Sequence, residues 1–152
     1  KEAMALHSDT IDEVKAEIES DDLPEIKGIS FQLIQLFDNL IGNSLKYRHS
    51  SRIPRLRVTC ERVDGQTIKD NNIESDKQFY KISFKDNGIG FEAQYSGKIF
   101  DLFQRLHSRA DYSGSGIGLA ICKKIVQNHH GFMDATGELN EGATFFVYFP
   151  VY

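Results

Sequence analysis

The sequence predicts a single domain, residues 1–152, with a two-layer α/β sandwich in which helices cover one face of a mixed sheet. Three observations predict this fold class. A length of 152 residues suits one hydrophobic core. A long amphipathic helix pattern lies in the first third of the chain, and short segments that alternate apolar and polar residues follow it.

The first 25 residues predict three short elements. An opening polar stretch is expected to be helical, a strand is expected around residues 14–18, and Asp21-Asp22-Leu23-Pro24 is typical of a turn. This segment carries nine acidic and two basic side chains, whereas residues 26–63 carry seven basic and two acidic ones. The chain therefore changes sign near Lys27.

Residues 31–47 carry the strongest helix pattern. Apolar side chains recur there every three or four positions and form one stripe that is expected to face a sheet: Leu33, Ile34, Phe37, Leu40, Ile41 and Leu45. Away from this stripe, Asn39, Asn43 and Lys46 lie at positions i, i+4 and i+7, within about 60° of one another. A carboxamide oxygen suits Mg²⁺ and an ammonium group neutralises phosphate, so this polar seam indicates phosphate chemistry, with a solvated helix face as the alternative.

Two strands are expected next, with alternating apolar residues at Leu56, Val58 and Cys60 and again at Tyr80, Ile82 and Phe84. The polar segment 64–78 between them predicts an exposed loop. Asp86 is in step with the second apolar set, so its carboxylate is expected on the buried side, where it needs a hydrogen-bond partner such as an adenine amine. The turn Asn87-Gly88-Ile89-Gly90 follows, where a flat ligand could approach the backbone; an ordinary strand-ending turn is the alternative.

A glycine-rich segment, Gly114-Ser115-Gly116-Ile117-Gly118, leads into a helix expected over residues 117–130 and closed by Gly131. Free N–H groups and the positive end of the helix dipole can hold phosphates there. The segment is not a P-loop, since the lysine and hydroxyl residue are absent, and not a Rossmann fingerprint, since the polar loop 104–113 precedes it. That loop could act as a lid, with an ordinary surface connection as the alternative. Strands are expected at 132–138 and 144–151.

The composition excludes several classes of protein. The net charge of −4 argues against a generally cationic binder of nucleic acid or membranes, and the basic run from Lys46 to Arg62 is interpreted as a solvated sheet face with phosphate contacts. Cys60 and Cys122 are too few for a disulfide framework, which favours a reducing compartment. No apolar run is long enough to span a bilayer. Because the chain starts at Lys1 without a leader, we expect it to be a fragment of a longer protein.

Five motifs follow one another along the chain: Asn39 to Tyr47 (NLIGNSLKY), Asp86 to Phe91 (DNGIGF), Ile99 to His107 (IFDLFQRLH), Gly114 to Ala120 (GSGIGLA) and Gly142 to Phe145 (GATF). Together they resemble the catalytic, ATP-binding domain of sensor histidine kinases, over residues 10–152. The resemblance implies a Bergerat-type ATP-binding fold, with a mixed, mostly antiparallel sheet and helices on one face. The third motif is most similar to kinases that carry phytochrome or other cytoplasmic sensory modules.

The resemblance implies ATP and Mg²⁺ as cofactors. Asn43 would coordinate Mg²⁺, Asn39 would support the phosphate and metal site, and Lys46 would contact phosphate. Asp86 would accept a hydrogen bond from the adenine amine, and Arg105 would stabilise charge at the γ-phosphate, so that Arg105, Lys46 and Asn39 are the implied catalytic residues. The remaining implied ATP-binding residues are Tyr47, Gly88, Gly90, Gly114, Gly116, Gly118, Leu119 and Thr144.

The resemblance also implies partners. Related kinases phosphorylate a histidine of a dimerisation and phosphoacceptor module, which we expect upstream of Lys1 in the parent protein. We further expect a downstream response regulator, a homodimeric full-length protein, a cytoplasmic location, and no contact of this domain with nucleic acid or a membrane. The fragment is not expected to autophosphorylate alone, because His7, His129 and His130 are interpreted as structural or solvated.

Three other functions stay open. An ATP-hydrolysing protein of the gyrase or heat-shock chaperone type usually carries a glutamate base where this chain has Asn39, and Asp38 lies about 100° away round the helix. A regulatory nucleotide-binding module without catalysis and a serine-kinase anti-sigma relative are the other two. One departure from the family is Gly142-Ala143-Thr144 in place of the commoner Gly-Ser-Thr, which leaves Thr144 but removes the middle hydroxyl.

Overall fold

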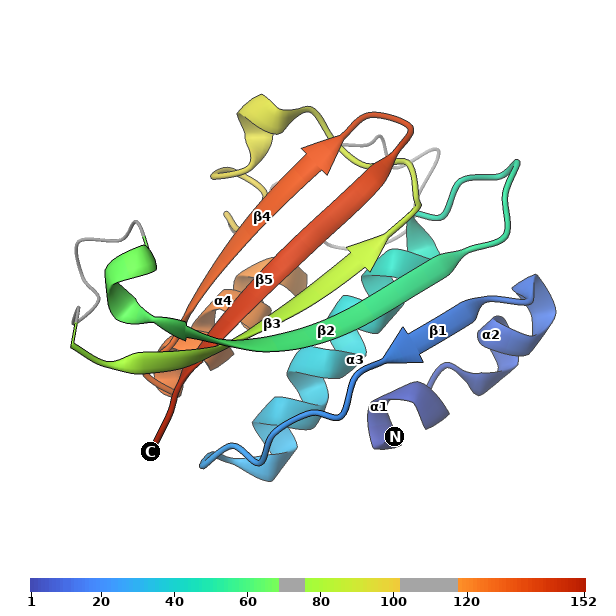
Figure 1. Ribbon diagram of the computed structural model, residues 1–152. Coiled ribbons are helices and arrows are strands. Elements are labelled where there is room, and N and C mark those ends of the chain that lie inside the picture. The colour runs from blue at the N-terminus through green and yellow to red at the C-terminus, as the bar shows by residue number, and fades with distance from the viewer. Residues whose placement is uncertain (69–75, 102–117) are drawn as a thin grey trace.

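The computed structural model describes residues 1–68, 76–101 and 118–152 (Figure 1). Its helices are α1 (Glu2–Ala5), α2 (Ser8–Val14), α3 (Ser30–Lys46) and α4 (Gly118–Asn128), and its 3-10 turns are η1 (Gly65–Thr67) and η2 (Ala93–Tyr95). Its strands are β1 (Glu17–Ser20), β2 (Arg55–Asp64), β3 (Gln78–Asp86), β4 (Phe132–Glu138) and β5 (Gly142–Pro150). Each helix within the three described ranges is too short or too polar to cross a bilayer.

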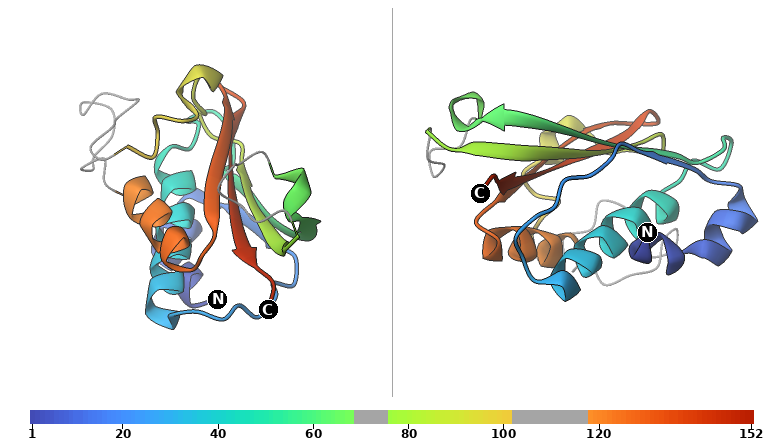
Figure 2. Two further views of the ribbon diagram at one scale, coloured as in Figure 1. Left: turned by 90° about the vertical axis from the view of Figure 1, so that its left-hand side faces the viewer. Right: turned by 60° about the horizontal axis from the view of Figure 1, so that its bottom comes forward.

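The five strands form one sheet in the order β1-β2-β3-β5-β4. β1 runs parallel to β2, and the other neighbouring pairs are antiparallel. Figure 2 shows the helices α1 to α4 on one face of this sheet. The predicted two-layer α/β sandwich, with a mixed and mostly antiparallel sheet, is therefore confirmed.

The core lies between the sheet and the layer formed by α3 and α4. Alternate strand residues face the helices and are buried: Leu56, Val58, Ile82, Phe84, Met133, Ala135, Phe145, Val147 and Phe149. From α3, Leu36 and Leu40 are 0% and 1% exposed, so Leu36 belongs to the apolar stripe although the sequence pattern did not single it out. Burial of a leucine of this kind contributes about 1.5–3 kcal/mol, which is why the stripe orients α3 on the sheet.

The first strand begins later than predicted. Residue Val14 ends α2, and Lys15 follows in the left-handed conformation with φ of 56°. That residue reverses the chain, so β1 extends from Glu17 to Ser20 rather than over residues 14–18. Charged residues alternate with Ile18 in β1, which leaves too little apolar pattern to locate its ends from sequence.

The end of α4 also differs from the prediction. His130, not Gly131, takes the left-handed conformation, with φ of 61°. The Gly131 N–H donates to the Val126 carbonyl and the His130 N–H to the Gln127 carbonyl, which together form a Schellman motif. Glycine is needed at position 131 for another reason, because a Cβ there would lie 1.8 Å from the Tyr148 carbonyl oxygen.

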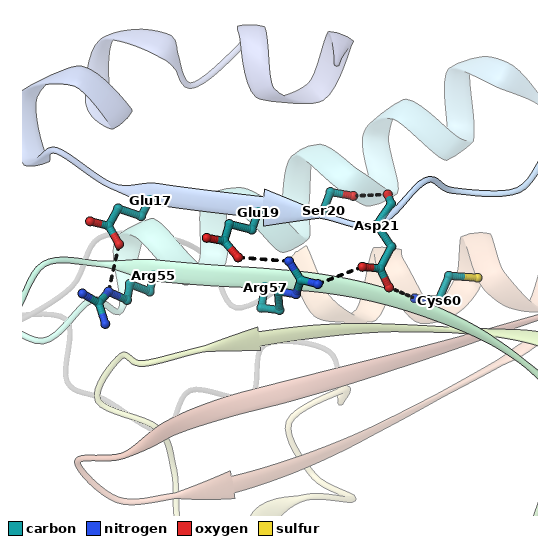
Figure 3. A network of polar contacts seen from close by, with 7 residues as sticks. All are labelled: Glu17, Glu19, Ser20, Asp21, Arg55, Arg57 and Cys60. Atoms are coloured by element: carbon teal, nitrogen blue, oxygen red, sulfur yellow. Dashed lines mark hydrogen bonds and ion pairs between the residues drawn. The ribbon is translucent and has the colours of Figure 1, made fainter.

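Ion pairs join β1 to β2 along their parallel register (Figure 3). Glu17 pairs with Arg55 at 2.9 Å, while Arg57 pairs with Glu19 at 3.0 Å and with Asp21 at 2.9 Å. The acidic N-terminal segment thus neutralises part of the basic run. These pairs are exposed, so each contributes about 0–1 kcal/mol, and they support the interpretation of a solvated sheet face.

Candidate functional site

Asn39 lies where α3 packs against α4. Its side chain is beside the Cys122 thiol. Burial raises the pKa of that thiol to about 12, and the Asn39 amide lowers this pKa by a smaller amount. A thiol is a weak acceptor, and the Asn39 Nδ2 atom is buried with no hydrogen-bond partner among the described residues. An unpaired buried donor costs about 1–3 kcal/mol, so this amide suits an acceptor that the described chain does not supply.

The two helices are antiparallel neighbours (Figures 1 and 2). At one end the Ile29 N–H donates to His129 Nε2 at 3.0 Å, and further along α3 Asn39 lies beside Cys122. Because the helices are antiparallel, the next turn of α3, which carries Asn43, lies opposite the first turn of α4. The polar seam of α3 therefore extends toward a helix N-terminus, where unpaired backbone N–H groups favour anions.

The last turn of α3 carries Asn43, Lys46 and Tyr47. The half-buried side chain of Asn43 makes no hydrogen bond to the described part of the chain. The Lys46 Nζ lies 5.0 Å from the centroid of the Tyr47 ring, a cation–π contact that keeps the ammonium beside the helix end. The Tyr47 carbonyl accepts the Ile89 N–H at 2.9 Å, which fixes this helix end to the turn after β3.

Asp86 ends β3 on the face that packs against the helices, as its step with Phe84 predicts. The Asp86 Oδ1 atom accepts the Gly88 N–H at 2.9 Å and the Ala143 N–H at 3.1 Å. No described residue donates to Oδ2. The carboxylate is therefore fixed by one oxygen and has the other available as an acceptor.

Burial raises the pKa of the Asp86 carboxyl above its ordinary value of 3.8, and the bonds from the Gly88 and Ala143 N–H groups lower it by less. The cause is the loss of hydration of the charged form. A desolvated carboxylate with a free lone pair binds an N–H donor more strongly than an exposed one does. This is the chemistry that the recognition of an amino group requires.

The packing of the chain itself requires glycine at positions 88 and 90. The expectation that these glycines also admit a ligand to the backbone stays a prediction. A Cβ at Gly88 would lie 2.4 Å from the Tyr47 carbonyl oxygen. At Gly90, φ is +62° and a Cβ would lie 2.1 Å from the Glu138 carbonyl oxygen. Both glycines therefore let backbone segments from distant parts of the sequence pack around Asp86.

Thr144 does not share the face of Asp86. In the register of β3 and β5 it lies opposite Lys85, so its side chain is on the face of the sheet away from the helices. The residue beside the carboxylate is Ala143, which is buried and contributes its N–H. The alternation of β5 predicts this, because Ala143 is in step with the buried Phe145. The implied contact of the Thr144 hydroxyl with adenine is not supported by this geometry.

The implied phosphate-binding residues divide between described and undescribed parts of the chain. Arg105, Gly114 and Gly116 lie within residues 102–117, outside the described residues. Gly118 is the first residue of α4, and a Cβ there would meet no atom of the described residues within 4 Å. Leu119 is half-buried against the core.

The histidines of this region are structural or solvated, as interpreted from sequence. His7 Nε2 pairs with Asp38 Oδ1 at 2.6 Å. His129 is 6% exposed, its Nδ1–H donates to the Ile125 carbonyl at 2.7 Å, and its other ring nitrogen accepts the N–H at the start of α3. His130 is exposed.

The residues present fit a nucleotide with Mg²⁺. The described ranges contain no group of three or more His, Cys, Asp or Glu side chains that could hold a metal ion. They do offer an amide oxygen at Asn43, a cation at Lys46 and an orphaned amide donor at Asn39. Mg²⁺ keeps several waters and binds through few protein ligands together with substrate phosphates, so this donor set is adequate.

Comparisons with known proteins agree with this geometry. Residues 28–152 match the family model described as Histidine kinase-, DNA gyrase B-, and HSP90-like ATPase. The chain is 43% identical over 141 residues to Cyanobacterial phytochrome A of Nostoc sp., covering 93% of this chain and 17% of that protein. It is 35% identical over 149 residues to Phytochrome-like protein Cph1 of Synechocystis sp., covering 98% of this chain and 18% of that protein.

Among solved structures, the chain is similar to full-length ShkA in complex with AMPPNP, with a TM-score of 0.73, 25% identity, and coverage of 97% of this chain and 28% of that one. The catalytic domain of the histidine kinase ThkA has the same fold, with a TM-score of 0.71 at 20% identity, and coverage of 98% of this chain and 88% of that one. The chain thus spans less than a fifth of the two phytochrome relatives. With the family model matching most of its length, the chain belongs to the family of histidine kinase-, DNA gyrase B- and HSP90-like ATPases.

Proposed function

We propose that this chain is the ATP-binding catalytic domain of a sensor histidine kinase, which transfers the γ-phosphoryl group of Mg-ATP to a histidine on a separate dimerisation module. The observation that carries the proposal is the Asp86 carboxylate, with Oδ1 fixed by two backbone N–H groups and Oδ2 available. An acceptor that is fixed and desolvated in this way suits the exocyclic amine of adenine.

The polar seam of α3 supports binding of the phosphates. Asn43 would coordinate Mg²⁺ and Lys46 would neutralise phosphate charge, while the orphaned Asn39 Nδ2 would find its acceptor in a phosphate oxygen. Bound Mg²⁺ would supply charge neutralisation at the reacting phosphates. Tyr47 would line the nucleotide pocket, and Arg105 would stabilise charge during transfer.

The glycines at the start of α4 complete the proposed phosphate site. Gly114, Gly116 and Gly118 would cradle the triphosphate, with the N–H groups of the first helical turn directed at it. The open space around Gly118 is compatible with this role, since no described protein atom occupies it.

Transfer is favoured over hydrolysis by the surroundings of Asn39. Hydrolysis needs a base to activate water, and an amide cannot take a proton at neutral pH. The nearest carboxylate on α3 is Asp38, whose Oδ1 pairs with His7 at 2.6 Å on the side of α1 and α2. Asp38 is therefore engaged away from the polar seam and does not replace the missing glutamate.

We also propose the partners that this reaction requires. The acceptor histidine would lie on a dimerisation and phosphoacceptor module of the parent protein, which would be a homodimer, and a response regulator would receive the phosphoryl group. The free cysteines Cys60 and Cys122 support work in the reducing cytoplasm. A regulatory nucleotide-binding module without catalysis is the second candidate, and the experiments below separate the two.

Calorimetric titration with a non-hydrolysable ATP analogue tests the site. Asn43→Ala should weaken binding chiefly when Mg²⁺ is present, and Asp86→Ala should weaken it with or without the metal. Asn128→Ala and Asp134→Ala are matched controls, because Asn128 and Asp134 are exposed and lie away from the proposed site. Equal affinity in all five proteins, including wild type, would contradict the site assignment.

A phosphorylation assay in trans tests the reaction. With radiolabelled ATP and the parent protein's dimerisation module, the domain should label a histidine in an acid-labile form. Rapid release of phosphate without that module would instead favour an ATPase. Tight ATP binding with neither labelling nor release would favour the regulatory module.

A further inference from the structure

We infer that Arg52 is a positioning residue for adenine recognition, because its guanidinium holds together the two backbone segments that fix the Asp86 carboxylate. The inference rests on the proposed function and goes beyond it, since it assigns the selectivity for a 6-amino purine to a side chain outside the family motifs. The sequence places Arg52 in the basic run that is interpreted as a solvated sheet face with phosphate contacts. The structure corrects this interpretation for Arg52, because its side chain donates to two backbone carbonyls.

Arg52 lies in the connection between α3 and β2 and is half-buried. Its Nη2 donates to the Gly88 carbonyl at 3.1 Å and also to the Asn140 carbonyl. Its Nε is buried without a partner among the described residues. Burial of Nε without a partner costs free energy, and the hydrogen bonds that Nη2 donates offset this cost and hold the guanidinium in place.

The two carbonyls belong to the segments that bind Asp86. Gly88 donates its N–H to Asp86 Oδ1 at 2.9 Å and accepts from Arg52 through its carbonyl. Asn140 lies in the hairpin between β4 and β5, three residues before Ala143, the second N–H donor to the same oxygen. Asp86, Gly88, Arg52 and the hairpin therefore form a closed ring of contacts.

A further bond within the ring makes the arrangement rigid. The Asn140 N–H donates to the Ile89 carbonyl at 2.8 Å, so the turn and the hairpin are joined directly as well as through Arg52. Without the guanidinium, the Gly88 and Asn140 carbonyls lose their shared donor, and of these contacts the bond from the Asn140 N–H to the Ile89 carbonyl is left to restrain the turn against the hairpin. The direction of Asp86 Oδ2, which sets which edge of a base can bind, then becomes less well defined.

The experiment compares two bases on the same triphosphate. Binding of a non-hydrolysable ATP analogue and of its inosine counterpart, both with Mg²⁺, is measured by calorimetry for wild type, Arg52→Gln, Arg52→Lys and the control Arg48→Gln. Hypoxanthine presents a carbonyl where adenine has its amine, so the Asp86 carboxylate discriminates between them. Arg48 is an exposed arginine whose Nη1 donates to the Leu45 carbonyl within α3, so it controls for the lost charge.

Wild type should bind the adenine analogue about tenfold or more tightly than the inosine analogue. Arg52→Gln should reduce this ratio to about threefold or less, mainly by weakening the adenine complex. Arg52→Lys should keep most of the ratio, since an ammonium can also donate to two carbonyl oxygens. Arg48→Gln should change both affinities equally and leave the ratio as in wild type.

An Arg52→Gln protein with the wild-type ratio overturns the inference, whatever its overall affinity. Loss of the fold in Arg52→Gln, seen by circular dichroism, also overturns it in favour of a purely structural role. Failure of the proposed function looks different, because wild type would then bind neither nucleotide. Equal binding of both nucleotides by wild type would remove the adenine contact of Asp86 and the inference with it.

Discussion

Replacement of Gly90 by alanine should destabilise the fold in the absence of any ligand. Gly90 has φ of +62°, and a Cβ there would lie 2.1 Å from the Glu138 carbonyl oxygen and 2.6 Å from the Gly142 carbonyl oxygen. Both atoms belong to the backbone of the hairpin between β4 and β5. No side-chain rotation can therefore relieve the clash, and the hairpin itself has to move.

The cost has two parts. An alanine in the left-handed conformation costs about 1–2 kcal/mol relative to glycine. Displacement of packed neighbours costs about 1–3 kcal/mol more. The sum of about 2–5 kcal/mol is a large share of the 5–15 kcal/mol typical of domains, and at about 2–4 °C per kcal/mol it lowers the unfolding temperature by about 4–20 °C.

Thermal unfolding followed by circular dichroism, without nucleotide, measures this effect. Gly118→Ala is the matched control, because a Cβ at that position would meet no atom within 4 Å in the part of the chain that the structure describes. Its unfolding temperature should stay the same or rise, since alanine favours a helix over glycine by up to about 1 kcal/mol. If Gly90→Ala unfolds at the wild-type temperature and loses only nucleotide affinity, the glycine serves the ligand and the packing argument is wrong.

Three further predictions concern the core, a titration and the thiols. Leu36→Ala should lower the free energy of unfolding in urea by about 2–5 kcal/mol, because Leu36 is fully buried. Leu23→Ala, at a residue that is 39% exposed, should lower it much less, and equal losses would contradict the core assignment. The pKa of the Asp86 carboxyl is higher in the folded chain than in the unfolded chain, so its ionisation lowers the stability of the fold as the pH rises from 3.8 through the folded pKa. Asp86→Asn should therefore be more stable than wild type at neutral pH and lose that advantage in acid. A stability difference that does not change with pH would refute this. A disulfide reagent at mildly alkaline pH should modify Cys60 in the folded chain and Cys122 only in denaturant, and rapid reaction of both would mean that the α3–α4 contact opens.

Periodicity was sufficient to predict most of the fold. The apolar stripe of α3 and the alternation in β2 and β3 depend on neighbours within a few residues, so their burial could be read along the chain. The same holds for Asp86, whose position follows from its step with Phe84. The ends of β1 were less predictable, because charged residues flank Ile18 on both sides.

The site was predicted less completely, because its contacts join distant segments. The atoms that require glycine at positions 88 and 90 belong to Tyr47 and Glu138, which no local pattern relates to the turn. The family motif drew attention to Thr144, although the pleat places Ala143 beside Asp86. Arg52 carries no motif, and its contacts with two backbone carbonyls distinguish it among the described arginines.

The hydrogen bond between Ile29 and His129 has a mechanical consequence. It joins α3 and α4 at the ends far from Asn43 and Gly118, so a tilt of α4 about this bond would move Gly118 the most. The eleven residues of α4 give this lever a length of about 16 Å. A tilt of about 10° would then move the Gly118 end by about 3 Å, roughly the diameter of a water molecule, while the His129 end stays in register.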